Sequence, residues 1–168
     1  MMADERSSVA VLGMGNLIYS DDGAGLRALW EIEKHPGLPS GVMIVDASAA
    51  GLPVLSLIEN AERLLILDAV HIGARPGTVV RLGDEDLRTF QGGAFAHDLG
   101  IPDLISALRL MGKGPREMVF LGIQADSIAL GTKLTPAVES GLPRLISESL
   151  SQLAEWTGEE ARLPTGRA

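Results

Sequence analysis

Three aspartates are the first residues in this chain whose placement suggests chemistry. Asp46 and Asp68 come directly after short apolar runs, and Asp22 follows a glycine-rich loop that closes an earlier apolar run. If these runs are parallel strands of one sheet, the three carboxylates lie at the carboxyl ends of the strands, where ligands gather in open α/β sheets. Carboxylates at such a place can bind a divalent cation or act as a general base.

Histidines offer a second kind of ligand, and the chain has three, His35, His71 and His97. His35 lies in a His-Pro-Gly sequence, which favours a solvated turn. His71 follows Asp68 by three residues and fits either a surface loop or a place beside that carboxylate. His97 follows a glycine-rich stretch and fits either an ordinary loop or a metal site. One imidazole with two carboxylates is a mixed ligand set that suits nickel, zinc or non-haem iron and leaves open positions for a substrate.

Each carboxylate also has a purely structural interpretation. Asp22, or its neighbour Asp21, precedes Gly23 and could cap a helix N-terminus, which stabilises a helix by about 1 kcal/mol. Asp68 could cap the turn after its strand, and Asp46 could hold a loop by accepting backbone hydrogen bonds. The convergence of the three carboxylates at one predicted sheet edge favours a functional site.

Other catalytic chemistries have less support. The chain contains no Gly-x-Ser-x-Gly and no His-Glu-x-x-His motif, and without cysteine it has no thiolate ligand, disulfide or cysteine nucleophile. The Gly-Met-Gly-Asn loop at 13–16 begins like a dinucleotide-binding fingerprint, but Ile18 replaces its third glycine. Carboxylates at 21 and 22 would repel a phosphate. A nucleotide-binding module, with Asp46 as the acidic ribose ligand, stays a minor alternative.

Composition narrows the class of protein further. The formal net charge of −8 argues against a nucleic-acid partner. No apolar run reaches the roughly 18 residues that a membrane span needs, so no membrane insertion is expected. The charged N-terminus lacks the apolar segment of a secretory signal, which predicts a cytoplasmic protein.

The elements that must position these residues alternate between apolar strands and amphipathic helices, which is typical of an α/β sandwich. Strands are expected at 8–12, 42–45, 64–67, 77–82 and 118–123. Helices are expected at 22–34, 54–60, 102–111 and 135–156, with an irregular loop at 83–99 and a frayed tail from 158. The predicted fold is therefore α/β: a single-domain three-layer sandwich over 1–168 (core about 8–157). Its sheet is twisted, about five-stranded and mostly parallel, with helices on both faces.

Four segments, in the same order along the chain, resemble the hydrogenase maturation endopeptidases. They are 13–17 with 21–25, 67–70 with the turn at 76–78, 97–100, and 134–139. The resemblance covers about 8–155. It implies an endopeptidase that recognises nickel in the precursor of a NiFe hydrogenase large subunit and removes the C-terminal extension of that precursor.

The resemblance also assigns roles to single residues. Asp22, Asp68 and His97 are implied as catalytic residues and as nickel ligands. The nickel is expected to be supplied by the substrate, and other divalent cations are expected to substitute in vitro. Asp46 and Ser48 are implied to meet the substrate.

Two departures from the family pattern accompany these roles. The family often has glutamate at the position of Asp22, so the carboxylate here reaches one methylene less far. The segment that commonly reads Asp-Gly-Gly-Thr is Asp-Ala-Ser-Ala at 46–49. A non-catalytic, nickel-dependent chaperone that docks on the same precursor would use the same ligands and is the alternative function.

Overall fold

A five-stranded sheet forms the centre of the computed structural model, which describes residues 8–48, 52–89 and 101–159. The strand order is β2-β1-β3-β5-β4. The strands are β1 (Val9–Gly13), β2 (Met43–Asp46), β3 (Arg63–Val70), β4 (Val79–Leu82) and β5 (Glu117–Gln124). The first three and β5 pair in parallel, whereas β4 pairs antiparallel with β5 at one edge.

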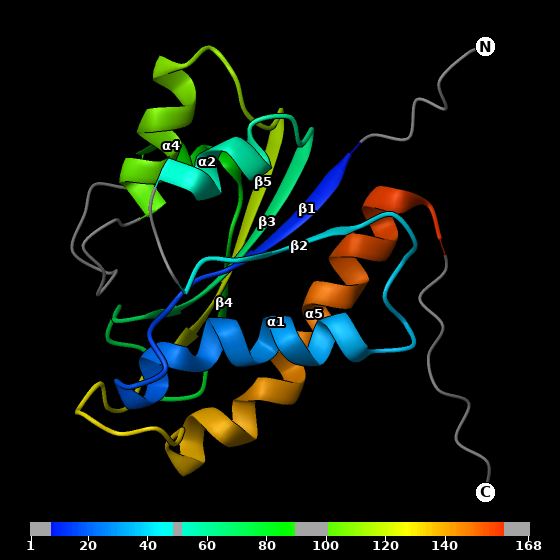
Figure 1. The fold of residues 1–168 in the computed structure, drawn as a ribbon. Coiled ribbons are helices and arrows are strands. Elements are labelled where there is room, and N and C mark those ends of the chain that lie inside the picture. Colours follow the sequence, from blue (N-terminus) through cyan, green and yellow to red (C-terminus); the bar gives the residue numbers. More distant parts are fainter. Residues whose placement is uncertain (1–7, 49–51, 90–100, 160–168) are drawn as a thin grey trace, which may run out of the picture.

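Helices cover both faces of this sheet (Figure 1). They are the 3-10 helix η1 (Ser20–Gly23) and the α-helices α1 (Ala24–Lys34), α2 (Leu52–Ile58), α3 (Asp84–Thr89), α4 (Ile101–Leu110) and α5 (Pro136–Thr157). α1 and α5 lie together on one face, and α2 and α4 lie on the other (Figure 1). Within the described residues, no helix is both long and apolar enough to cross a membrane.

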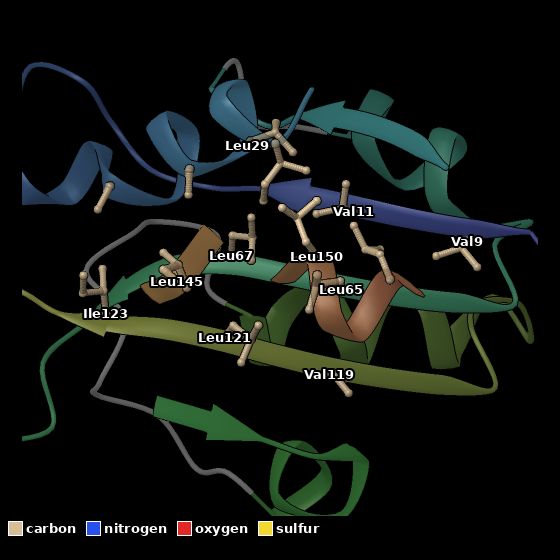
Figure 2. Close-up of a cluster of buried hydrophobic side chains, with 14 of the residues drawn as sticks. Val9, Val11, Leu29, Leu65, Leu67, Val119, Leu121, Ile123, Leu145 and Leu150 are labelled. Atoms are coloured by element: carbon tan, nitrogen blue, oxygen red, sulfur yellow. The ribbon is translucent and has the colours of Figure 1, made fainter. Parts of the chain in front are cut away.

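The alternation of side chains along the strands builds one core on each face. Val9 and Val11 of β1 pack with α1 and α5, while Ala10 and Leu12 belong to the cluster that includes residues of α2, α3 and α4. Figure 2 shows the first cluster, in which Leu29 lies with strand residues of the same face. Strands buried on both faces need continuous apolar runs, which is why the sequence shows runs rather than alternation.

The predicted three-layer α/β fold with a mostly parallel five-stranded sheet is confirmed. The predicted end of the third strand is wrong, because β3 continues through Asp68 to Val70. Ala69 and Val70 are each 1% exposed and pair with Ile123 and Gln124 of β5. A single aspartate therefore does not end a strand whose following residues are buried and paired.

The predicted irregular loop at 83–99 is wrong in its first part, where the structure has α3. Asp84, Glu85 and Asp86 occupy its first turn, where the helix dipole favours negative charge. The Gly83 N–H donates to Asp86 Oδ2 at 3.1 Å, and Leu87 is buried in the core at 3% exposure. The predicted helix at 54–60 is shifted, since α2 runs from Leu52 to Ile58.

Candidate active site at the carboxyl edge of the sheet

The order β2-β1-β3 creates a topological switch point between β1 and β3. The chain leaves β1 toward β2 on one side, with α1 on one face, and returns through α2 on the other face to β3. Open α/β sheets bind their ligands outside the carboxyl ends of the strands at such a point. Asp22 follows β1 and Asp68 lies in β3, so both predicted ligands belong to this switch point.

Asp22 lies in η1 and is only 4% exposed. The Asn16 N–H donates to Asp22 Oδ2 at 3.1 Å and to the Asp22 carbonyl at 3.3 Å. Gly15 has a φ of 135°, and a Cβ at this position would lie 2.0 Å from the Asp22 carbonyl oxygen. Glycine at 15 therefore allows the loop after β1 to fold closely around Asp22.

The helix-capping interpretation of Asp22 and Asp21 is wrong. α1 begins at Ala24, its N-cap residue is Gly23, and this cap has no side-chain hydrogen bond. A full 3-10 turn separates the strand loop from α1, and both carboxylates lie within that turn. They stand where a dinucleotide-binding fold would place a phosphate, which argues further against the nucleotide-binding alternative.

Asp68 is fully buried within β3, at 0% exposure. The Ala69 N–H donates to Asp68 Oδ1 at 2.8 Å. The turn-capping interpretation is wrong, because the strand continues past this residue. Along β3, Asp68 shares the side-chain direction of Leu64 and Ile66, which belong to the core under α2 and α4.

Backbone contacts join the segments that flank Asp22 to β3 at the residue before Asp68. The Met14 N–H donates to the Leu67 carbonyl at 2.9 Å, directly before Asp68. Gly25 lies against the same carbonyl, where a Cβ would come within 2.5 Å of the oxygen. The two predicted carboxylate ligands are thus held at one edge by neighbouring, tightly packed backbone.

The third predicted ligand, His97, lies outside the described residues, so its role stays a prediction. Within the described ranges, no group of three or more histidine, cysteine, aspartate or glutamate side chains is placed to hold a metal ion. The structure places Asp22 and Asp68 at the same switch point, and their role as metal ligands stays a prediction.

The other two histidines lie in different surroundings. His35 is in the predicted turn, where its Nδ1 accepts a hydrogen bond from the Gly37 N–H at 2.9 Å. His71 directly follows β3, and its Nε2 is buried without a hydrogen-bond partner among the described residues. His71 is thus a half-buried residue of the loop after β3, as the surface-loop interpretation expects, although its Nε2 atom is shielded from solvent.

Asp46 lies at the same sheet edge but on the opposite face from Asp68, which corrects the expected convergence of three carboxylates. In the parallel register, Asp46 and Leu67 both pair with Gly13, and Leu67 belongs to the core on the α1 face. The Trp30 indole of α1 accordingly donates to Asp46 Oδ2 at 3.0 Å.

Asp46 and Ser48 are both exposed, and they form a local turn. The Ser48 N–H donates to Asp46 Oδ1 at 2.8 Å, which confirms the loop-holding interpretation. Burial raises the pKa of Asp46, but hydrogen bonds from Ser48 and Trp30 outweigh this effect and hold the pKa below its ordinary value. Trp30, which donates to Asp46, also lines a groove of about 570 Å³. Its lining is Arg27, Trp30, Glu31, Lys133, Leu134, Glu139 and Leu142.

Asp21 is the residue whose importance the sequence analysis missed. It is 0% exposed, and its carboxylate accepts hydrogen bonds from Asp126, Ser127 and Thr135. The only sequence signal was its place beside Asp22 in an Asp-Asp-Gly run, because its partners lie more than a hundred positions away along the chain.

Comparisons with known proteins identify relatives over nearly the whole chain. Residues 26–152 match the family model HycI, described as hydrogenase maturation protease. The hydrogenase expression/formation protein HupD of Rhodobacter capsulatus is 35% identical over 159 residues, which cover 93% of this chain and 76% of that protein. The hydrogenase 2 maturation protease of Escherichia coli is 34% identical over 155 residues, covering 91% and 94%.

A solved structure agrees with these relatives. The hydrogenase maturating endopeptidase HybD from E. coli superposes with a TM-score of 0.78 at 32% identity, covering 88% of this chain and 92% of that one. The fold, the sequence relatives and the family model lead to the same assignment. The chain belongs to the hydrogenase maturation protease family.

Proposed function

We propose that this protein is an endopeptidase that cleaves the C-terminal extension from the precursor of a NiFe hydrogenase large subunit, once nickel is present in that precursor. The observation that carries the proposal is the burial of Asp22 and Asp68 together at the switch point, in a chain of the hydrogenase maturation protease family. Carboxylates at this position fit cation recognition better than nucleotide binding.

Nickel recognition is supported by the chemistry of the two acids. Neighbouring carboxylates repel each other, and a divalent cation between them relieves this repulsion. Asp22 and Asp68, joined by His97, would complete the coordination of the nickel that the precursor carries. Such a mixed oxygen and nitrogen set suits nickel. Cleavage would then depend on prior metal insertion, because only a metal-bearing precursor offers a favourable partner to both acids.

Peptide hydrolysis then needs an activated water and a polarised carbonyl. The substrate's nickel could supply either effect, and one of the two carboxylates could instead take the proton of the water. Asp46 and Ser48 would meet the substrate outside the metal-binding pair. Their turn is held by hydrogen bonds within it and from Trp30 of α1, a residue that also lines the groove, and it would give the precursor a preorganised polar contact.

The test is a mass measurement on the large subunit. Purified protein is incubated with nickel-loaded precursor, and the expected result is loss of the mass of the C-terminal extension. Metal-free precursor should stay intact. A stable complex with an unchanged precursor mass would instead support the nickel-dependent chaperone, the alternative function.

The same cleavage assay on His97→Ala tests whether His97, which lies outside the described residues, is the third ligand. We expect this variant to keep the circular dichroism spectrum of the parent protein and to lose tail removal. Normal processing by the folded variant would remove His97 from the proposed site. Another divalent cation is expected to replace nickel in the precursor, which in vitro cleavage would test. The protein is also expected to be cytoplasmic, which cell fractionation would test.

A further inference from the structure

The Asp21 carboxylate is a buried hydrogen-bond acceptor that none of the proposed chemistry uses. Its Oδ2 accepts from the backbone N–H groups of Asp126 and Ser127 at 2.9 and 3.0 Å. The Thr135 N–H donates to Oδ1 at 2.7 Å, and the Thr135 hydroxyl donates to Oδ2 at 2.8 Å. Four donors thus satisfy a carboxylate that is removed from water.

These donors belong to the connection between β5 and α5, which Asp21 ties to η1. Thr135 is the N-cap residue of α5 but makes no capping bond with its own side chain. The Asp21 carboxylate accepts from the N–H and the hydroxyl of Thr135 and so lies beside the N-terminus of this 22-residue helix, where the helix dipole favours a negative charge. The Asp21 N–H returns a hydrogen bond to the Ser127 carbonyl at 3.1 Å.

Two sets of hydrogen bonds therefore hold Asp22, the next residue, in place. The preceding residue, Asp21, anchors η1 to the β5–α5 connection. In the loop after β1, the Asn16 N–H donates to the side chain and to the carbonyl of Asp22. We propose that Asp21 is a positioning residue of the active site: its buried carboxylate holds η1 in place and thereby sets where the Asp22 carboxylate lies.

The hydrogen-bond pattern requires a carboxylate rather than an amide. Oδ2 accepts three of the bonds and Oδ1 accepts the fourth, so both oxygens face donors. Asparagine keeps only one oxygen, and its NH₂ group would face N–H or O–H donors in either orientation. Asp21→Asn is nearly isosteric, yet it breaks the anchor while preserving side-chain volume.

The experiment compares Asp21→Asn with the parent protein by two measurements. The first is the NMR chemical shift of the Asn16 amide, which reports the position of Asp22 without any activity assay. We expect this signal to move, while amide signals of β3 such as those of Leu64 and Leu65 stay in place. The second is the rate of tail removal, which should fall roughly ten- to a hundredfold, as expected when a reacting group is displaced by a fraction of an ångström to about 1 Å.

Ser20→Ala is the matched control. The Ser20 hydroxyl donates to the Ala129 carbonyl at 2.7 Å and so links the same two segments without touching Asp21. We expect it to leave the Asn16 signal in place and the rate within about twofold of the parent. A shift and rate loss as large as those of Asp21→Asn would show that any weakening of this contact suffices, which would overturn the specific role of Asp21.

Thr135→Val keeps the experiment decisive if Asp21→Asn does not fold. It removes one donor of the four, and a smaller change in the same direction is expected. An unchanged Asn16 signal and an unchanged rate in a folded variant of either kind would overturn the proposal. The activity measurement rests on the proposed function, whereas the NMR measurement does not. If the parent protein cleaves no precursor, the proposed function fails and the NMR result still decides the role of Asp21.

Discussion

Asp68 and Asp46 lie near the carboxyl ends of parallel strands, yet the sheet places them in opposite environments. β3 lies between β1 and β5, so Asp68 is covered by neighbouring strands and is fully buried. β2 is an edge strand, and Asp46 is its exposed last residue. Burying a carboxylate is costly unless hydrogen bonds or a cation compensate it. The buried acid is for that reason the stronger indication of function, while the exposed acid is explained by its turn.

The largest expected effect is that of removing the charge at Asp68. Asp68→Asn keeps the side-chain volume and an oxygen that can accept the Ala69 N–H, but it removes the negative charge proposed to bind nickel. We expect the rate of tail removal to fall on the order of 10²–10⁴-fold, with a cooperative unfolding transition retained. Mass spectrometry over a time course checks the rate. Processing at the parent rate would place the chemistry elsewhere and would make Asp68 a structural acid.

Two substitutions of Asp22 separate the effect of its charge from the effect of its side-chain length. Asp22→Asn removes the charge and should lower the rate of tail removal roughly a hundredfold or more. Asp22→Glu keeps the charge, and its extra methylene must fit a site that is 4% exposed, so a loss of no more than about tenfold is expected. Equal losses in the two variants, measured in the same cleavage assay, would mean that packing rather than charge matters at this position.

The loop that holds Asp22 predicts the next effect in size. Gly15→Ala forces an alanine to a φ of 135° and places its Cβ against the Asp22 carbonyl, which should lower the free energy of unfolding by about 1–3 kcal/mol. It should also slow tail removal, because Asp22 must shift to relieve the collision. Chemical denaturation and the cleavage assay give the two quantities.

Gly73→Ala is the control for Gly15→Ala. Gly73 has a φ of 75°, but nothing lies within 4 Å of a Cβ built there. This variant should be destabilised by the strained backbone alone, by about 1 kcal/mol, and should cleave the precursor at the parent rate. If the two alanine variants lose activity equally, the close contact between Gly15 and Asp22 has no role in the site.

The predictable part of the site was the part that depends on local order along the chain. The sequence pattern of strands followed by acids predicted that Asp22 and Asp68 lie at one sheet edge, because parallel strands share the edge at which they end. The face on which an acid lies depends on register, and a shift of one residue reverses it. Asp46 and Leu67 both pair with Gly13, so Asp68, the residue after Leu67, faces the opposite way from Asp46. No local sequence pattern reveals this register.

Long-range hydrogen bonds cannot be predicted from local sequence for the same reason. The neighbours of Asp21 along the chain suggest a helix cap, whereas its donors at 126, 127 and 135 follow β5, more than a hundred residues later. α3 was missed for a different reason, since three acids after a glycine look like a polar loop until the buried Leu87 shows what the segment packs against.

The smallest expected effect is that of Asp46→Asn. The pKa of Asp46 is held below its ordinary value of 3.8, so its ionised form favours the folded state. That contribution is fully present above pH 3.8 and is lost as the pH falls through the lower folded value. It is small, because the side chain is exposed and screened by solvent. Urea denaturation should therefore show the parent slightly more stable than Asp46→Asn at pH 7, with the difference shrinking in acid. A difference that persists unchanged below the folded pKa would show that the Trp30 and Ser48 contacts depend on shape rather than charge.

In the cleavage assay, the same variant should raise KM for the precursor modestly with little change in kcat, since Asp46 is proposed to contact the substrate away from the reacting bond. A loss of kcat as large as that of Asp68→Asn would erase the distinction between the buried and the exposed acid.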